Sequence, residues 1–193
     1  MRKALIPLAD GFEEIEAITV IDVLRRGEVE VVTASLTNSL QVHAAHAMTV
    51  MADALLSDVI NDEWDAIILP GGSRGMENLR ACETLLERLR RQKEQGGLIC
   101  AICAAPLVLE AAGIIENEHV TCYPTCAEMM EHDVQHVPTI ADGQLITSAG
   151  PGTAMLFAFV ILQHLAAAEQ AADDATQVTA DPHAVAHSML VQF

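Results

Sequence analysis

The sequence predicts an α/β fold in which helices cover both faces of a mostly parallel β-sheet. Between Lys3 and Gly113, short and continuously apolar segments alternate with segments whose apolar residues recur at helical spacing. Strands buried on both faces of a parallel sheet have this continuous apolar character, and strand–helix alternation is typical of such sheets. The chain has 193 residues, of which 51% are hydrophobic, and this length suits one domain. We therefore expect a single domain over residues 1–193.

The first predicted helix shows the helical pattern clearly. Ala17, Val20, Ile21 and Leu24 follow one another at helical spacing, and Gly27 is a residue type that commonly ends a helix. Glycines also end the later elements of this half. Here we expect strands over residues 3–8, 29–34, 65–69 and 98–102, helices over 13–26, 78–95 and 104–112, and a small hairpin or excursion over 37–52.

The second half of the chain is less regular. Residues 137–140 and 144–148 flank the turn-forming segment Ala141-Asp142-Gly143 and predict a β-hairpin. Asp181-Pro182 can start a helix, because proline is tolerated in the first turn of a helix. For the remaining segments we expect a strand over 119–123, a helix over 153–168, a loop over 169–181 and a last short helix that begins at Asp181-Pro182.

The charge and the apolar pattern exclude several classes of protein. Lys and Arg number 10 against 27 Asp and Glu, a formal net charge of −17. Such a chain repels phosphate backbones and anionic lipid surfaces, so we expect neither nucleic acid nor a membrane as a partner. No stretch approaches the roughly 20 apolar residues of a membrane span. The apolar run behind the basic start is too short for a signal peptide, and we expect a cytoplasmic protein.

Cys103 is the candidate residue with the clearest chemical signal. It lies where a predicted buried strand turns directly into a helix, among the small residues Ala101, Ala104 and Ala105. Free backbone N–H groups and the helix dipole at such a turn favour a thiolate, and the same N–H groups can hold an oxyanion formed by attack on a carbonyl. The geometry resembles a nucleophile elbow. The alternative is a buried structural cysteine that packs as a small hydrophobic residue.

Glu16 is the second candidate. It lies in the first turn of the first helix, four residues before Val20, and therefore borders the apolar face of that helix. A carboxyl group against apolar surface has a raised pKa and can stay protonated, and beside a cysteine it could hydrogen-bond the sulfur or carry protons. The alternative is an acidic residue stabilised by the helix dipole, an explanation that suffices for Glu13 and Glu14.

The other cysteines and the histidines do not predict a metal site. The five cysteines of a cytoplasmic protein are expected to be thiols. Cys100 and Cys103 would face opposite sides of the sheet, which argues against a redox Cys-x-x-Cys pair and against a four-cysteine zinc site completed by Cys122 and Cys126. The histidine pairs at four-residue and three-residue spacing are expected to be exposed: His132 and His136, and His43 and His46.

Four segments carry a family resemblance. They are Gly11-Phe12-Glu13-Glu14-Ile15-Glu16-Ala17, Ile68-Leu69-Pro70-Gly71-Gly72, Ala101-Ile102-Cys103-Ala104-Ala105-Pro106 and Ser148-Ala149-Gly150-Pro151-Gly152-Thr153. In order and spacing they resemble the ThiJ/PfpI superfamily, and within it the branch that contains Parkinson disease protein 7 and its bacterial chaperone-like relative YajL. Each segment alone is common, whereas the four together are specific and cover almost the whole chain.

The resemblance implies a flavodoxin-like sandwich that forms homodimers. It places the family's reactive cysteine at Cys103, its protonated glutamate partner at Glu16, and backbone donors near the sulfur at Gly72 and Ala104. Tyr123 stands where some relatives carry a histidine near the cysteine, and we expect it to contribute to substrate binding. This substitution weakens any proton transfer through a histidine.

The resemblance also implies activity on methylglyoxal or glyoxal without a metal or organic cofactor. The family is credited with hydration to a hydroxy acid, repair of early glycation adducts on proteins, chaperone behaviour and oxidant sensing through a cysteine sulfinic acid. His46 stands where the branch usually has an arginine, so the resemblance does not define the dimer-facing side of the site. Ala104 stands where protease-type members carry a histidine, which disfavours a Cys–His protease.

Three functions are consistent with these residues. The leading hypothesis is an enzyme in which Cys103 attacks the aldehyde carbon of a small 2-oxoaldehyde, or of a glycated protein, and Glu16 moves the proton. The second is a redox sensor or holdase in which Cys103 is oxidised to a sulfinic acid beside Glu16. The third is an interaction or scaffold dimer with an inert site, for which the pKa of Cys103 would be ordinary.

Overall fold

One sheet of seven strands forms the centre of the computed structural model, which describes residues 1–171 and 179–191. The strands are β1 (Lys3–Leu8), β2 (Glu30–Ser35), β5 (Ala54–Leu55), β6 (Ala66–Leu69), β7 (Leu98–Ile102), β8 (Thr139–Asp142) and β9 (Leu145–Ser148). Their spatial order is β5-β2-β1-β6-β7-β9-β8, and every neighbouring pair is parallel except the β8–β9 hairpin. The expected mostly parallel sheet is therefore confirmed.

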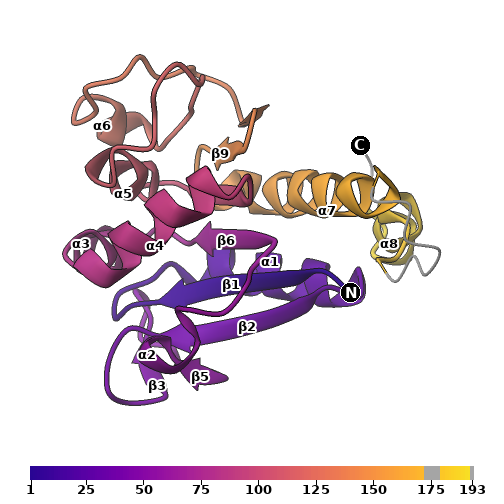
Figure 1. Ribbon diagram of the computed structural model, residues 1–193, viewed down its shortest axis with the longest axis horizontal. Coiled ribbons are helices and arrows are strands. Elements are labelled where there is room, and N and C mark those ends of the chain that lie inside the picture. Colours follow the sequence, from indigo (N-terminus) through magenta and orange to yellow (C-terminus); the bar gives the residue numbers. More distant parts are fainter. Residues whose placement is uncertain (172–178, 192–193) are drawn as a thin grey trace.

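Helices lie on both faces of this sheet. Figure 1 shows α7 running out beside the sheet to α8, with α3, α4 and α5 stacked on the other side. The helices are α1 (Glu14–Arg26), α2 (Leu56–Val59), α3 (Ser73–Arg80), α4 (Glu83–Glu94), α5 (Pro106–Ala111), α6 (Pro124–Ala127), α7 (Ala154–Ala171) and α8 (Pro182–Ser188), and a 3₁₀ turn spans Pro151–Thr153. A separate antiparallel hairpin, β3 (Gln41–His43) and β4 (Thr49–Met51), occupies the expected excursion.

The continuous apolar strands follow from this sandwich. In β1, Ile6 and Leu8 belong to the core layer shared with α1 and α7, whereas Leu5 belongs to the layer shared with α3, α4 and α5. Side chains alternate along a strand, so both faces need apolar residues when both are covered. In β6, Ile67 and Ile68 divide between the two layers in the same way.

α7 is a core helix. It is the one helix, among the described residues, that is long and apolar enough to cross a membrane. Its side chains Phe157, Ile161 and Leu162 are fully buried and pack in the layer that contains α1. The helix also reaches further than expected, because it continues to Ala171 into the segment predicted to be a loop. Residues 172–178 of that segment lie outside the described residues.

Two of the predicted secondary-structure elements are wrong. The single helix expected over 78–95 is two helices, α3 and α4, because Cys82 adopts an extended conformation (φ −88°, ψ 92°) and its carbonyl accepts the N–H groups of Leu85 and Leu86. The strand expected over 119–123 is absent: Val120 forms only an isolated bridge with Val134. The helix expected over 104–112 begins later, at Pro106.

Candidate functional site

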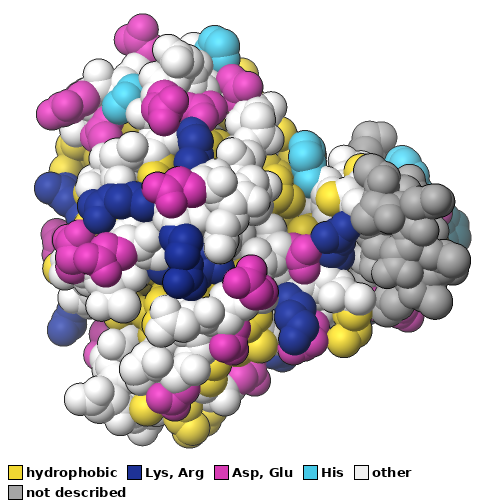
Figure 2. Space-filling view, in the orientation of Figure 1, with side chains coloured by type: hydrophobic (Ala, Val, Ile, Leu, Met, Phe, Trp, Pro, Cys, Tyr) yellow, Lys and Arg dark blue, Asp and Glu magenta, His cyan; other side chains and the backbone are white. Residues whose placement is uncertain are grey.

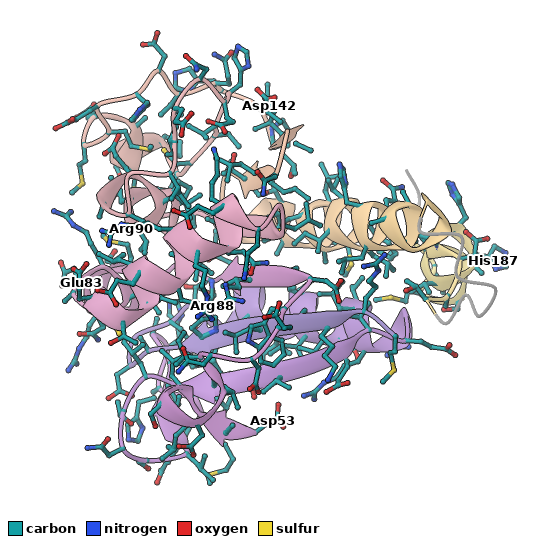
Figure 3. All side chains as sticks on the ribbon, in the orientation of Figure 1. Asp53, Glu83, Arg88, Arg90, Asp142 and His187 are labelled. Atoms are coloured by element: carbon teal, nitrogen blue, oxygen red, sulfur yellow. The ribbon has the colours of Figure 1, made fainter. Side chains whose placement is uncertain are left out.

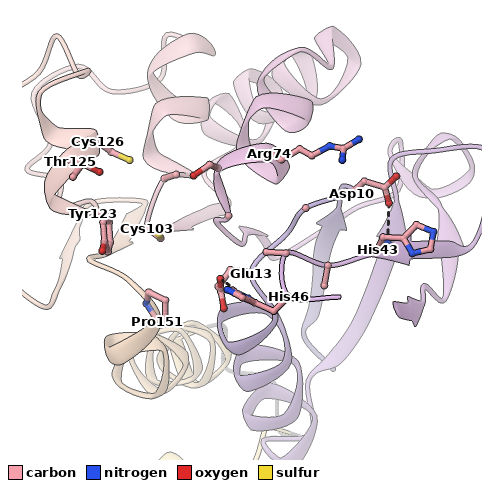
Figure 4. A pocket seen from close by; sticks show the side chains of 16 residues that line it. Asp10, Glu13, His43, His46, Arg74, Cys103, Tyr123, Thr125, Cys126 and Pro151 are labelled. Carbon is pink, nitrogen blue, oxygen red and sulfur yellow. Dashed lines mark hydrogen bonds and ion pairs between the residues drawn. The ribbon is translucent and has the colours of Figure 1, made fainter. Parts of the chain in front are cut away.

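A pocket of about 720 Å³ lies at the carboxyl ends of the parallel strands. Segments that follow β1, β6, β7 and β9 meet there, as expected for ligand sites in open α/β sheets. Figure 4 shows Cys103 and Tyr123 at one end of the pocket and Asp10, His43 and Arg74 at the other. The lining residues are Asp10, Gly11, Glu13, His43, Ala44, Ala45, His46, Gly72, Ser73, Arg74, Cys103, Ala104, Tyr123, Thr125, Cys126 and Pro151.

Cys103 occupies a sharp backbone turn directly after β7. Its φ of 64° lies in the left-handed region, which is uncommon for a residue other than glycine and is a feature of strained functional turns. Two backbone hydrogen bonds hold the turn: Cys103 N–H donates to the Ser148 carbonyl over 2.9 Å, and Tyr123 N–H donates to the Cys103 carbonyl over 2.9 Å. The side chain is half-buried and lines the pocket. The structure thus shows the sharp turn that the sequence predicts at this position.

Glu16 lies behind Cys103 and is completely buried. Its Oε2 atom accepts the Gly71 N–H over 2.7 Å, while its buried Oε1 atom accepts no hydrogen bond of ordinary geometry from the described residues. The Cys103 sulfur interacts with this carboxyl group. Burial raises the pKa of Glu16 from 4.5 to about 7, against the opposing effect of the Gly71 N–H. A protonated Glu16 near neutral pH is therefore accessible, in line with the sequence prediction.

The electrostatics of Cys103 oppose its ionisation more than the sequence suggests. Burial raises the pKa of the Cys103 thiol, and the negative charge of Glu16 raises it further. The backbone N–H groups of Gly72 and Ala104 act in the other direction and lower that pKa. When Glu16 holds its proton, its repulsion of the sulfur disappears and only these two donors and burial remain. The thiolate at neutral pH stays a prediction, tied to the protonation of Glu16.

The Gly71-Gly72 turn brings backbone donors close to this pair. Gly72 has a φ of 89°, and a Cβ atom there would lie 2.3 Å from the Gly11 carbonyl oxygen. A Cβ atom at Gly71 would lie 2.7 Å from both the Cys103 Cβ and the Glu16 Oε2. Only glycine permits this approach, which agrees with the tight turn expected after β6.

Tyr123 forms the wall of the pocket next to Cys103. Its ring packs against Gly150, where an added Cβ atom would lie 3.1 Å from Cδ2, and its side chain is 43% exposed. Of the five site residues that the sequence predicts, Cys103, Gly72, Ala104 and Tyr123 line the pocket. The fifth, Glu16, supports the sulfur from behind.

Sequence reasoning did not assign a role to several other residues that line the pocket. His43 and His46 are exposed, as expected, yet both line the pocket, as do Arg74, Thr125 and Cys126. These residues come from loops and short helices that are distant in the sequence. No local pattern in the sequence signals that they converge.

His46 anchors the loop between β3 and β4 to the start of α1. Its backbone N–H and its Nδ1 atom contact the two Glu14 oxygens at 2.6 and 2.9 Å, and Glu13 Oε2 lies 3.6 Å from Nδ1. Burial raises the pKa of Glu14, but the hydrogen bonds from His46 outweigh it and lower that pKa overall. Among the described residues, one group of three His, Cys, Asp or Glu side chains lies close enough together to hold a metal ion. It consists of Glu13, Glu14 and His46.

The cysteines are arranged differently from the expectation. Cys103 leaves the strand at its positive φ and packs against the same core layer as Cys100, so the expected opposite orientation is wrong. Cys122 and Cys126 belong to the other core layer. The four sulfurs are therefore divided between the two faces of the sheet.

Comparisons with known proteins agree with the fold. The model of the DJ-1/PfpI family matches residues 2–164. Protein dj-1beta of Drosophila melanogaster is 38% identical over 172 residues, which cover 88% of this chain and 92% of that protein. The glutathione-independent glyoxalase DJR-1.2 of Caenorhabditis elegans is 40% identical over 169 residues, which cover 86% of this chain and 89% of that protein.

Two plant relatives are longer. Protein DJ-1 homolog B of Arabidopsis thaliana is 40% identical over 180 residues, and the match covers 89% of this chain but only 40% of that protein.

Among solved structures, oxidized Toxoplasma gondii DJ-1 superposes with a TM-score of 0.90 at 33% identity, covering 100% of both chains. Drosophila melanogaster DJ-1beta gives a TM-score of 0.89 at 35% identity, covering 100% of this chain and 99% of that one.

Proposed function

Because this chain belongs to the DJ-1/PfpI family, we propose that it is a cysteine-dependent enzyme that converts small 2-oxoaldehydes, such as methylglyoxal, to 2-hydroxy acids. The observation that carries the proposal is the pairing of Cys103, on a strained turn in a pocket, with a fully buried Glu16 whose pKa is about 7. A relative of this chain is named a glutathione-independent glyoxalase. An acid with a pKa near the working pH suits proton transfer in both directions.

The proposed reaction begins with addition of the Cys103 sulfur to the aldehyde carbon. A carbon–sulfur bond forms, and the carbonyl electron pair becomes an oxyanion that takes a proton to give a hemithioacetal. Glu16 then takes the proton from this carbon and passes it to the neighbouring carbonyl oxygen, which gives an enediol. Transfer of the proton of the first hydroxyl group to the second carbon then leaves a thioester of the hydroxy acid. Water cleaves the thioester, releases the hydroxy acid and returns the thiol.

The pocket supplies the other groups that this chemistry needs. The N–H groups of Gly72 and Ala104, which interact with the sulfur, are donors for the developing oxyanion. Tyr123 bounds the space in which the substrate carbonyls would lie. Nucleophile, acid and donors all belong to the chain, so the proposed reaction requires no metal or organic cofactor.

The test is the production of lactate from methylglyoxal by the purified protein. Cys103→Ser is expected to lower kcat/KM by at least about 1,000-fold, because the nucleophile is lost. Cys82→Ser is the matched control, since Cys82 caps α4 and does not line the pocket. Thermal melts of both variants verify folding. Equal rates for wild type and Cys103→Ser would exclude the proposed enzyme.

The same site could act on glycated proteins. The adduct of methylglyoxal with a protein thiol is itself a hemithioacetal, and transfer of its carbon to the Cys103 sulfur would release the protein thiol before the steps above. The pocket opens to solvent beside Tyr123 and Thr125, which are exposed. Recovery of free thiol and lactate from a preformed peptide adduct, faster than spontaneous methylglyoxal release allows, is the expected result.

Oxidant sensing by Cys103 is the second candidate function. One related structure is described as the oxidized form of its protein. In this chain the protonated form of Glu16 can donate a hydrogen bond from Oε1, which has no other partner of ordinary geometry among the described residues. Two molecules of hydrogen peroxide, acting in turn, would each transfer one oxygen to the sulfur and leave water, and the resulting sulfinate accepts this bond. Mass spectrometry after mild peroxide should then find the two added oxygens at Cys103 before any of the other four cysteines is oxidised. Random oxidation of all five cysteines would exclude a sensing role for Cys103.

We also propose a homodimer in the cytoplasm, without a nucleic-acid or membrane partner. α1 and α7 pack together, and each helix carries large apolar side chains that are exposed. Ile15 is 55% exposed and Ile18 42% exposed on α1, and Met155 and Leu156 are each 37% exposed on α7. Apolar side chains gathered on one surface of a chain are typical of a protein–protein interface.

A further inference from the structure

A second, smaller pocket lies on the opposite side of the sheet from α1 and α7. It has a volume of about 260 Å³ and lies between α4 and the loop that follows α2. None of its residues lines the Cys103 pocket. The lining residues are Ile60, Asn61, Thr84, Glu87, Arg88 and Arg91.

Arg88 brings a buried positive charge to this pocket. Its side chain is 3% exposed, and its Nε and Nη2 atoms donate to the carbonyls of Ile60 and Asp62 over 3.0 and 3.2 Å. The third nitrogen, Nη1, is buried and has no hydrogen-bond partner among the described residues. Arg88 makes no ion pair with a described carboxylate, although buried charges are nearly always paired. One donor of Arg88 is therefore left without a partner, and its charge is opposed only through space, by Glu63.

Arg91, almost one turn further along α4, also has a buried donor without a partner. Its Nη2 atom donates to the Asn61 carbonyl over 3.5 Å, and its Nε atom is buried without a partner among the described residues. Burial and the neighbouring charge of Arg91 lower the pKa of Arg88. Glu87 lines the pocket but is exposed and makes no ion pair with either arginine. Two guanidinium groups thus share one small pocket with unused donors.

The helix beside this pocket has a small excess of basic residues in a strongly acidic chain. α4 carries four of the 10 Lys and Arg residues, Arg88, Arg90, Arg91 and Lys93, against three glutamates. Figure 2 shows dark blue side chains over and beside this helix, with magenta ones among them. The hydroxyl of Thr84, exposed at the pocket, offers a further donor.

We propose that this pocket binds a phosphate group, held between the Arg88 and Arg91 guanidinium groups with the Thr84 hydroxyl as an additional donor. Guanidinium groups bind phosphate oxygens with charge-assisted, often bidentate, hydrogen bonds. The phosphate supplies the acceptors that Arg88 Nη1 and Arg91 Nε lack and neutralises the pair. The ligand is either inorganic phosphate or a small phosphate monoester, because the pocket is only about 260 Å³.

Calorimetric titration of the full chain with sodium phosphate, against sodium chloride of equal ionic strength, tests the site. Saturable phosphate binding is expected, together with a phosphate-dependent rise in Tm. Arg91→Gln should weaken the binding by about 10-fold or more, because a hydrogen bond to a charged group is lost. Glycerol 3-phosphate in a parallel titration separates the two ligand sources: tighter binding assigns a monoester, and equal or weaker binding assigns inorganic phosphate.

Arg90→Gln is the matched control on the same helix. Arg90 donates to the Ala112 carbonyl and pairs with Glu83, and it does not line the pocket. Figure 3 shows Arg88 and Arg90 leaving α4 on different sides. Phosphate affinity should be unchanged in this variant. Arg88→Leu should abolish phosphate binding. If the thermal melt of this variant shows misfolding, the test rests on weaker phosphate binding by Arg91→Gln and Thr84→Val. Absence of phosphate binding by the wild type, or equal losses in Arg90→Gln and Arg91→Gln, would overturn the site.

Discussion

At the scale of single residues, Cys103 and Glu16 act as one titrating unit. Each negative charge opposes the other, so the pair carries one charge over a range of pH. Burial raises the pKa of both groups, while the N–H groups of Gly71, Gly72 and Ala104 favour a negative charge in the same space. The Gly71 N–H favours that charge on Glu16, whereas the Gly72 and Ala104 N–H groups favour it on the sulfur. The proposed chemistry requires the second arrangement, with the proton on Glu16.

Replacement of Glu16 by Gln should change how stability depends on pH. The pKa of Glu16 is raised in the folded protein, so its contribution to stability is fully present below pH 4.5 and is lost as the pH rises to about 7. The loss amounts to about 3 kcal/mol for a shift of this size. Glu16→Gln should flatten this decline in urea unfolding measured across the range, whereas Glu77→Gln, at an exposed position on α3, should keep it. A decline as steep in Glu16→Gln as in wild type would contradict the raised pKa.

Gly72→Ala should damage both stability and the site. The left-handed backbone costs an alanine roughly 1–2 kcal/mol, and the clash with the Gly11 carbonyl forces the turn to move as well. Gly96 is a matched control, because it has a similar φ of 81° and no atom within 4 Å of an added Cβ. Gly96→Ala should lose only the backbone cost and keep full activity with methylglyoxal. Equal losses in the two variants would show that the approach to Gly11 does not matter.

The residues that the sequence could identify are those defined by their place in an element. Cys103 follows a buried strand, and Glu16 occupies the first turn of a helix next to its apolar face, so local pattern indicates both as candidates, while their roles come from the family resemblance. Arg74 and Thr125 line the same pocket only because loops from distant parts of the chain meet there. Their convergence depends on topology, which no short-range pattern contains.

At the scale of elements, the errors lie where the apolar pattern continues through a change of backbone direction. Leu79, Leu85 and Leu86 are all buried in one core layer, so the helical spacing gives no sign that the chain turns at Cys82. The two-residue strand β5 and the four-residue helix α2 are too short for any periodicity to reveal. The long strands and α1 were predictable because burial on defined faces dictates their composition.

The packing of α1 on α7 provides a test at this scale. A Cβ atom at Gly27, which ends α1, would lie 2.3 Å from Cδ1 of the fully buried Leu162 on α7. Gly27→Ala should therefore destabilise the protein by roughly 1–3 kcal/mol through overpacking. Leu162→Ala alone leaves a cavity and should cost about 2–5 kcal/mol. In the double variant the new methyl group enters the vacated space, so urea unfolding should show a smaller loss than the sum; strict additivity would contradict the contact.

At the scale of the whole molecule, the order of the strands creates the site. β1, β6 and β7 are adjacent and parallel, so the segments after them, which carry Gly11, Gly72 and Cys103, meet at one edge. The sequence predicted the sheet and its covering helices, but not which strands are neighbours. α1 then places Glu16 beneath Cys103, and its opposite side carries the exposed Ile15 and Ile18. The support of the nucleophile and the proposed dimer surface thus share one helix.

Ile18→Asp should convert the proposed homodimer to a monomer. A charge in the middle of an apolar interface would be buried without a partner, which opposes association. Light scattering coupled to size exclusion should give twice the 20.7 kDa chain mass for the wild type and a single chain mass for the variant. Leu190→Asp is the control, because Leu190 is 88% exposed and lies beyond α8, on neither α1 nor α7. A monomeric wild type, or a variant that stays dimeric, would show that this surface has another role. Because α1 also carries Glu16, loss of the dimer should lower turnover with methylglyoxal while Cys103 remains in place.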